Sequence, residues 1–186
     1  MKSNILPAIK LTILSILLLV VIYPIAVWSI AQLSPNNGKG MLIEHEDNAY
    51  YANIGQLFTE DKYFSSRPSA VDYNAAGSGA SNKGASNPGY LAEVQSRIDS
   101  ILVKNPGVNI SDIPVDLITA SGSGLDPNIS VQGATIQVNR IASVRNIPTE
   151  TIYQLIEQQT EQPLLGVFGP SKINVLKLNI ALDTLK

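Results

Sequence analysis

The feature that most constrains this 186-residue chain is a run of 23 residues without a charged side chain, from Leu11 to Leu33. As a helix rising about 1.5 Å per residue, the run is roughly 34 Å long, enough to cross a hydrocarbon core of about 30 Å. A cleaved signal peptide would have a shorter apolar region and end in small residues, whereas bulky Trp28 follows Ala26 and Val27 here. We therefore expect a retained transmembrane helix, kinked at Pro24 and with Trp28 near the membrane interface.

The charges that flank this run predict its orientation. Lys2 and Lys10 precede it, and the first charge after it is Lys39. Because short basic flanks stay in the cytoplasm, we expect residues 1–10 inside, the span at 11–33, and an extracytoplasmic domain at 34–186 of a single-pass plasma-membrane protein. That domain has 11 basic residues (13 minus Lys2 and Lys10) and 15 acidic ones, a net charge of about −4, which gives no reason to expect nucleic acid as a partner. The absence of cysteine rules out disulfides and thiolate chemistry.

Three helices are predicted in the outer domain. One begins at Asn87-Pro88, where a capping side chain precedes proline, and continues to Asn105-Pro106. A second is capped by Ser130 or Asp126, and a third begins at Pro148-Thr149 and ends before Pro163. The apolar positions expected to face the core are Leu91, Val94, Ile98 and Ile101 in the first, Val131, Ala134, Val138, Ile141 and Ala142 in the second, and Ile152, Leu155 and Ile156 in the third.

The remaining segments predict strands and loops. Residues 112–119 are rich in β-branched side chains, and residues 174–182 alternate, with Leu176, Leu178, Ile180 and Leu182 on one face, so both are expected to be strands. Residues 51–64 are expected to be short helical or turn-rich, anchored by Ile54, Leu57, Phe58 and Phe64. Residues 72–89 are rich in Gly, Ser and Asn and indicate a loop. The predicted fold is a single N-terminal transmembrane helix followed by a mixed α/β (α+β) domain.

Signatures of catalysis are weak. No serine lies in a Gly-x-Ser-x-Gly elbow, and no Gly-x4-Gly-Lys-Ser/Thr phosphate loop is present. The single histidine, His45, lies in an acidic run and predicts no metal site. Two Asn-x-Ser triplets, at Asn109 and Asn128, are compatible with glycosylation of an external domain, although such triplets arise easily by chance.

The stretch TASGSGLDPNIS, residues 119–130, leaves two interpretations open. It predicts a strand, a tight turn of small residues, and a helix start at Asp126-Pro127, whose free N–H groups could accept an anion or a partner's carbonyl. The third glycine of a dinucleotide fingerprint is replaced by Pro127, so the nucleotide interpretation is weak. The alternative is a well-built connection with no ligand.

Several segments together resemble one family. The segments YFSSRPSA (63–70), SGASNKGASNP (78–88), VDLITASGSGLDPNIS (115–130), QVNRIASVR (137–145) and INVLKLNIALD (173–183) have the order and spacing of the small C subunit of Kdp-type potassium-transporting P-type ATPases. The chain departs from the family pattern at Ala80, Lys83 and Ala85, and Gln159 replaces the histidine of a common His-Thr-Glu triplet. The last change puts in doubt any role that requires an imidazole.

The resemblance implies a non-catalytic accessory subunit of a high-affinity ATP-driven potassium uptake pump. Such a subunit assists assembly and raises the ATP affinity of the hydrolysing subunit, as a catalytic chaperone. The implied partners are the catalytic P-type ATPase subunit, a potassium-channel-like subunit and the lipid bilayer. The chain is expected to have no cofactor or metal of its own, and ATP enters at the level of the complex.

The residues that the resemblance assigns to partner contact or loop integrity are Arg67, Pro68, Ser69, Ser81, Asn82, Ser86, Asn87, Asp116, Ser121, Ser123 and Asp126. For each of them, internal loop structure is the open alternative. The competing function is a stand-alone membrane-anchored extracytoplasmic domain that binds or hydrolyses a ligand by itself.

Overall fold

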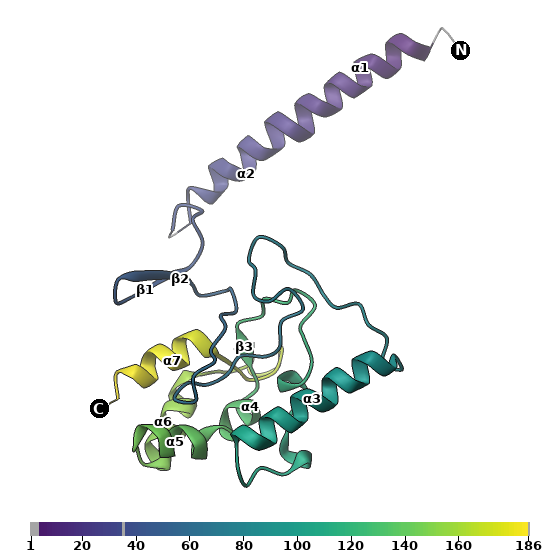
Figure 1. Ribbon diagram of the computed structural model, residues 1–186. Coiled ribbons are helices and arrows are strands. Elements are labelled where there is room, and N and C mark those ends of the chain that lie inside the picture. The colour runs from purple at the N-terminus through teal and green to yellow at the C-terminus, as the bar shows by residue number, and fades with distance from the viewer. Residues whose placement is uncertain (1–3, 35, 186) are drawn as a thin grey trace. The chain divides into compact units, whose positions relative to one another are not determined.

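The N-terminal unit is dominated by one long apolar helix. The computed structural model describes residues 4–34 and 36–185, and the chain divides into compact units at 1–44 and 45–186. The helix spans Ile5–Ala31, with a mean hydropathy of 2.7 in its most apolar window, and is long and apolar enough to cross a membrane. It comprises α1 (Ile5–Ile16), a π-helical segment (Leu17–Ile22) and α2 (Tyr23–Ala31), drawn as one continuous helix in Figure 1.

The π-helical turns come directly before Pro24. Proline has no N–H to donate, and its ring collides with the carbonyl one turn earlier in an α-helix. Wider turns at Leu17–Ile22 relieve that conflict without ending the helix. The bounds of the helix also differ from those predicted for the span, residues 11–33. The helix starts earlier and includes Lys10, and it ends before Leu33.

The second unit mixes short strands with helices, as predicted. Its first elements are β1 (Leu42–His45), which straddles the division between the units, and β2 (Asn48–Tyr51), which together form a two-stranded sheet. The remaining elements are α3 (Pro88–Lys104), 3₁₀ turns at Ile110–Asp112 and Val115–Leu117, β3 (Asn128–Ile129), α4 (Val131–Thr135), α5 (Val138–Arg145), α6 (Thr149–Gln159), β4 (Thr160–Glu161), β5 (Lys172–Asn174) and α7 (Val175–Asp183).

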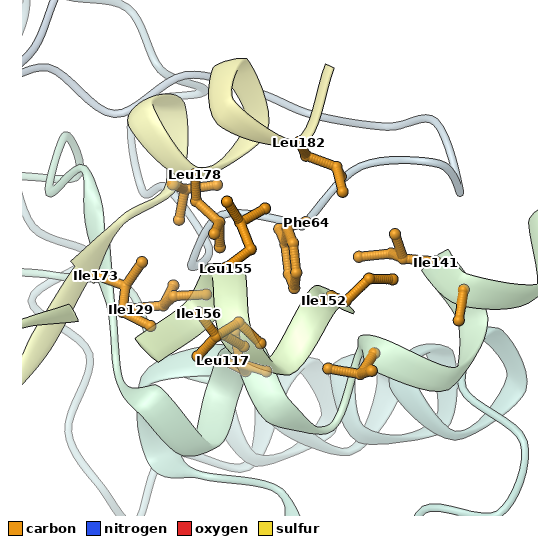
Figure 2. Close-up of a cluster of buried hydrophobic side chains, with 14 residues drawn as sticks. Phe64, Leu117, Ile129, Ile141, Ile152, Leu155, Ile156, Ile173, Leu178 and Leu182 are labelled. Carbon is orange, nitrogen blue, oxygen red and sulfur yellow. The ribbon is translucent and has the colours of Figure 1, made fainter. Parts of the chain in front are cut away.

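A small antiparallel sheet and three helices enclose the core. The strand order is β3-β5-β4, and Ile173 of β5 lies opposite Ile129 on one side and Thr160 on the other. Side chains from α5, α6 and α7 converge on this sheet, and Figure 2 shows Phe64 among Leu155, Ile152 and Leu182. Burying such side chains stabilises each by roughly 1.5–3 kcal/mol relative to exposure.

Asn179 holds the backbone of Phe64 at this core. The side chain lies on α7 and is buried. Its Oδ1 accepts from Phe64 N at 2.8 Å, and its Nδ2 donates to Phe64 O at 2.9 Å. The two bonds satisfy a backbone that has no strand partner there, so Phe64 stays fully buried.

Two of the three predicted helices are confirmed. Asn87 caps α3 by accepting from Tyr90 N at 3.0 Å, and α6 begins at Thr149 with Ile152, Leu155 and Ile156 buried. On α3, Val94, Ile98 and Ile101 are half-buried, but Leu91 is exposed. The loop predicted at 72–89 contains no helix or strand before α3 begins at Pro88, and Figure 1 shows it as a wide excursion.

The second predicted helix is divided into α4 and α5. Its cap is Ser130, which accepts from Gly133 N at 3.0 Å, and not Asp126. The division falls at Gln137, whose side-chain Nε2 donates to Gly133 O at 2.8 Å. That carbonyl is the one that the backbone N–H of Gln137 would bond in a continuous α-helix, and this N–H bonds Ala134 O instead.

Both predicted strands are wrong. Residues 174–182 are mostly helix α7, because Asn174 caps it by accepting from Lys177 N at 3.1 Å, and Leu178 and Leu182 fit a helical period as well as an alternating one. Residues 112–119 form 3₁₀ turns around Pro114. Residues 51–64 are turn-rich, and Leu57, expected as an anchor, is exposed.

Candidate partner-contact surface

An ion pair joins two of the segments singled out in the sequence. Arg67 Nη1 donates to Asp126 Oδ2 at 2.7 Å, with 19% and 29% of the two side chains exposed. Arg67 Nη2 lies 3.5 Å from Thr119 O. Of the buried side-chain nitrogen and oxygen atoms in the described part of the chain, Arg67 Nε alone has no hydrogen-bond partner. The guanidinium is thus held in place by Nη1 and Nη2, while its buried Nε is unpaired among the described residues.

Ser69 organises the start of the loop that follows. Its Oγ donates to Gly124 O at 2.6 Å and accepts from the backbone N–H groups of Val71 at 3.2 Å and Tyr73 at 2.9 Å. The phenol of Tyr73 donates to Arg67 O at 2.7 Å, and burial raises the pKa of this phenol above its usual value. Residues 67–73 are therefore bonded to the corner at 119–126 as well as to themselves.

The corner itself is closed by internal hydrogen bonds. Gly124 N donates to Ser121 O at 3.2 Å, and Ser123 Oγ accepts from Leu125 N at 3.1 Å. Ser123 O accepts from Gly79 N at 2.9 Å, which holds the long loop against the corner.

No helix starts at Asp126, contrary to the prediction. The Asp126 Oδ1 atom instead accepts from Asn128 N at 3.0 Å, and β3 follows at once. The N–H groups of Gly124, Leu125 and Asn128 donate within the chain and are not available to an anion. These bonds connect Ser121 to Asn128 within the chain.

Asp116 supports the start of α4. Its Oδ2 accepts from Ser130 N at 2.6 Å and its Oδ1 from Ser130 Oγ at 3.0 Å. The same Ser130 hydroxyl accepts from Gly133 N, so the carboxylate fixes the cap residue from outside the helix. Asp116 and Asp126 are both committed to structural bonds.

The structure does not bring all the predicted residues together. Three of them, Pro68, Ser121 and Ser123, are half-buried in the bonded segments 67–73 and 119–126. Three others, Ser81, Asn82 and Ser86, are exposed in the second half of the long loop, residues 81–87, which we call the exposed arm. Asn87 caps α3, and Lys83 of this arm contacts Glu93 on α3. Asn87 and Lys83 thus connect the exposed arm to α3, and Ser81, Asn82 and Ser86 face solvent.

An open cleft of about 590 Å³ borders the ion pair and includes residues that the sequence did not indicate. Pro170, Ser171 and Lys172 line it together with Arg67, Asp116 and Asp126. The pairing of β5 with β3 brings these residues to the site from more than forty positions away in the chain, and no local pattern announces that pairing. Within residues 4–34 and 36–185, no group of three or more His, Asp or Glu side chains is placed to hold a metal ion.

Comparisons with known proteins agree on one family. Residues 5–184 match the family model described as KdpC, the c chain of a K⁺-transporting ATPase. The chain is 54% identical over 185 residues to a potassium-transporting ATPase KdpC subunit of Flavobacterium psychrophilum, covering 99% of this chain and 100% of that protein. It is 44% identical to KdpC subunits of Bacteroides fragilis and Bacillus cereus, covering 99% of this chain and 98% and 97% of theirs. The chain therefore belongs to the KdpC family.

Proposed function

We propose that this chain is the non-catalytic accessory subunit of an ATP-driven potassium uptake pump, anchored by Ile5–Ala31. The observation that carries the proposal is the family match over residues 5–184, which includes the membrane helix as well as the folded unit. The geometry supports a contact role, because the carboxylates beside the cleft hold backbone groups and a guanidinium and so fix the shape of this surface.

The proposal places the N-terminus in the cytoplasm and the folded unit outside the cell. Lys2 and Lys10 flank the span on its N-terminal side, and this charge bias favours that orientation. The partners are the ATP-hydrolysing P-type subunit and the potassium-conducting subunit. An effect on the ATP affinity of the hydrolysing subunit then acts through contact between subunits, since an outer unit meets little ATP.

Two measurements test the proposal. Purification of the tagged full chain in mild detergent should recover a P-type ATPase subunit and a second large membrane subunit, and recovery of the chain alone would refute the assembly role. A cysteine at exposed Ser86 should react with an impermeant thiol reagent in intact cells, whereas a cysteine at Ser3 should react only after the cells are opened. The reverse labelling pattern would refute the orientation.

A further inference from the structure

A small apolar hairpin projects from the second unit. Residues 163–171 read PLLGVFGPS and carry no charge, between Glu161 and Lys172 at the paired strands β4 and β5. Leu164 is 70% exposed, Leu165 83%, Val167 74% and Phe168 64%. We call residues 163–169 the apolar hairpin. Elsewhere in residues 45–185, the exposed large apolar residues occur singly along the sequence.

The apolar hairpin is ordered by its own hydrogen bonds. Leu164 N donates to Phe168 O at 3.0 Å, and Phe168 N donates to Leu164 O at 3.0 Å. Gly166 N also donates to Pro163 O at 2.9 Å. Four large apolar side chains are therefore displayed on a defined turn, and a contact that uses them need not order the backbone first.

The most exposed of these residues also has an unfavourable backbone. Leu165 has φ of 55° and Gly166 has φ of 76°. Two consecutive positive φ values are the pattern of a type I′ turn, for which Asn-Gly is the preferred pair and a bulky residue is an outlier. A leucine at this position lowers the stability of the folded chain through its backbone conformation, and its exposed side chain adds no stability through burial within this chain. Such a combination points to a side chain that is buried by something else.

The size of the patch suits part of a protein interface. Four side chains of this kind together expose on the order of 500 Å², which is comparable to the largest apolar patch of a typical monomer, a patch that is often functional. A standard interface takes about 800 Å² from each partner, so the hairpin supplies much of one side without completing it. The cleft beside it continues the surface, because Pro170, Ser171 and Lys172 follow the hairpin directly and line that cleft with Arg67.

The composition favours a protein over a lipid surface. Segments that lie in a membrane interface combine Trp, Phe or Leu on one face with Lys or Arg on the other. Residues 163–171 carry Leu and Phe but no basic side chain, and the Nζ of the next basic residue, Lys172, lies 3.7 Å from Glu161 Oε2.

We propose that the apolar hairpin inserts into an apolar pocket of another protein subunit of the pump, with Leu165 and Phe168 as its anchors. This inference rests on the function proposed above and identifies the surface that performs it. The polar cleft, which Arg67 and Asp126 line, then forms the rim of the same interface.

The variant Leu165→Asn separates contact from folding. Asparagine tolerates the left-handed backbone and restores the preferred Asn-Gly turn, so the unfolding midpoint of the full chain should stay equal or rise. Recovery of the other pump subunits with the tagged chain should fall by about tenfold, as expected for an interface anchor. The matched control is Val103→Asn on α3, where the valine is 79% exposed, and its recovery should equal that of the wild type.

Photocrosslinking identifies the occupant without relying on stability. A benzoylphenylalanine at Phe168 of the full chain, illuminated in native membranes, should form a covalent adduct with another pump subunit. Adducts with lipid or with a second copy of this chain would overturn the inference, as would undiminished recovery with Leu165→Asn. If the wild-type chain recovers partners and Leu165→Asn recovers them equally, only the hairpin is wrong. If the wild type recovers none, the proposed function itself fails.

Discussion

The Gly124→Ala variant tests how the long loop is held against the corner. Gly124 has φ of +68°, and a Cβ atom added there would lie 2.8 Å from both Gly79 O and Val71 Cγ2. The left-handed backbone costs an alanine about 1–2 kcal/mol, and overpacking adds about 1–3 kcal/mol. We expect the free energy of unfolding to fall by about 2–5 kcal/mol, which lowers the unfolding midpoint by roughly 4–20 °C for a unit of this size.

Gly122→Ala is the matched control, two residues away in the same turn. A Cβ atom at Gly122 meets no atom within 4 Å, and its backbone is not left-handed. The midpoint of this variant should therefore stay within about 2 °C of the wild type, since exposed substitutions change stability by about 0.5 kcal/mol or less. Thermal unfolding of the detergent-solubilised full chain, followed by circular dichroism, compares the two. Equal midpoints for both alanine variants would refute the close approach of residues 71 and 79 to the corner.

Three further predictions concern the bonds that build the site. Arg67→Ala should reduce recovery of pump subunits more than it lowers the unfolding midpoint, and a lower midpoint with intact recovery would make Arg67 purely structural. Burial raises the pKa of Tyr73 in the folded chain. The neutral phenol therefore contributes its full stability below the usual phenol pKa of about 10, and this contribution is lost as pH rises through the higher folded pKa. In an alkaline titration of the free energy of unfolding, Tyr73→Phe should lose stability less steeply than the wild type. Asn179→Ala should cost about 2–4 kcal/mol in chemical denaturation by leaving two buried backbone groups unpaired, whereas Asn139→Ala on the exposed face of α5 should cost less than about 0.5 kcal/mol.

The sequence alone determined the features that depend only on residues adjacent along the chain. A long uncharged run specifies an apolar helix whatever surrounds it, and Asn87-Pro88 and Pro148-Thr149 mark helix starts through local capping and fixed φ. The Gly/Ser/Asn-rich loop was predicted for the same reason, since its composition cannot bury a core. Motif order along the chain also indicated the family, which the comparisons confirm.

Only the tertiary structure decided between a strand and a helix where the apolar positions of a short segment fit both periodicities equally. Leu178 and Leu182 fit a strand face or a helix face, and α7 forms because Asn174 caps it and both leucines reach the core that surrounds Phe64. The same holds for the site, where Asp126 was predicted as a helix cap but pairs with Arg67, 59 residues away in the chain. Such choices depend on contacts between distant segments, because burial and hydrogen-bond satisfaction are properties of the whole packed unit.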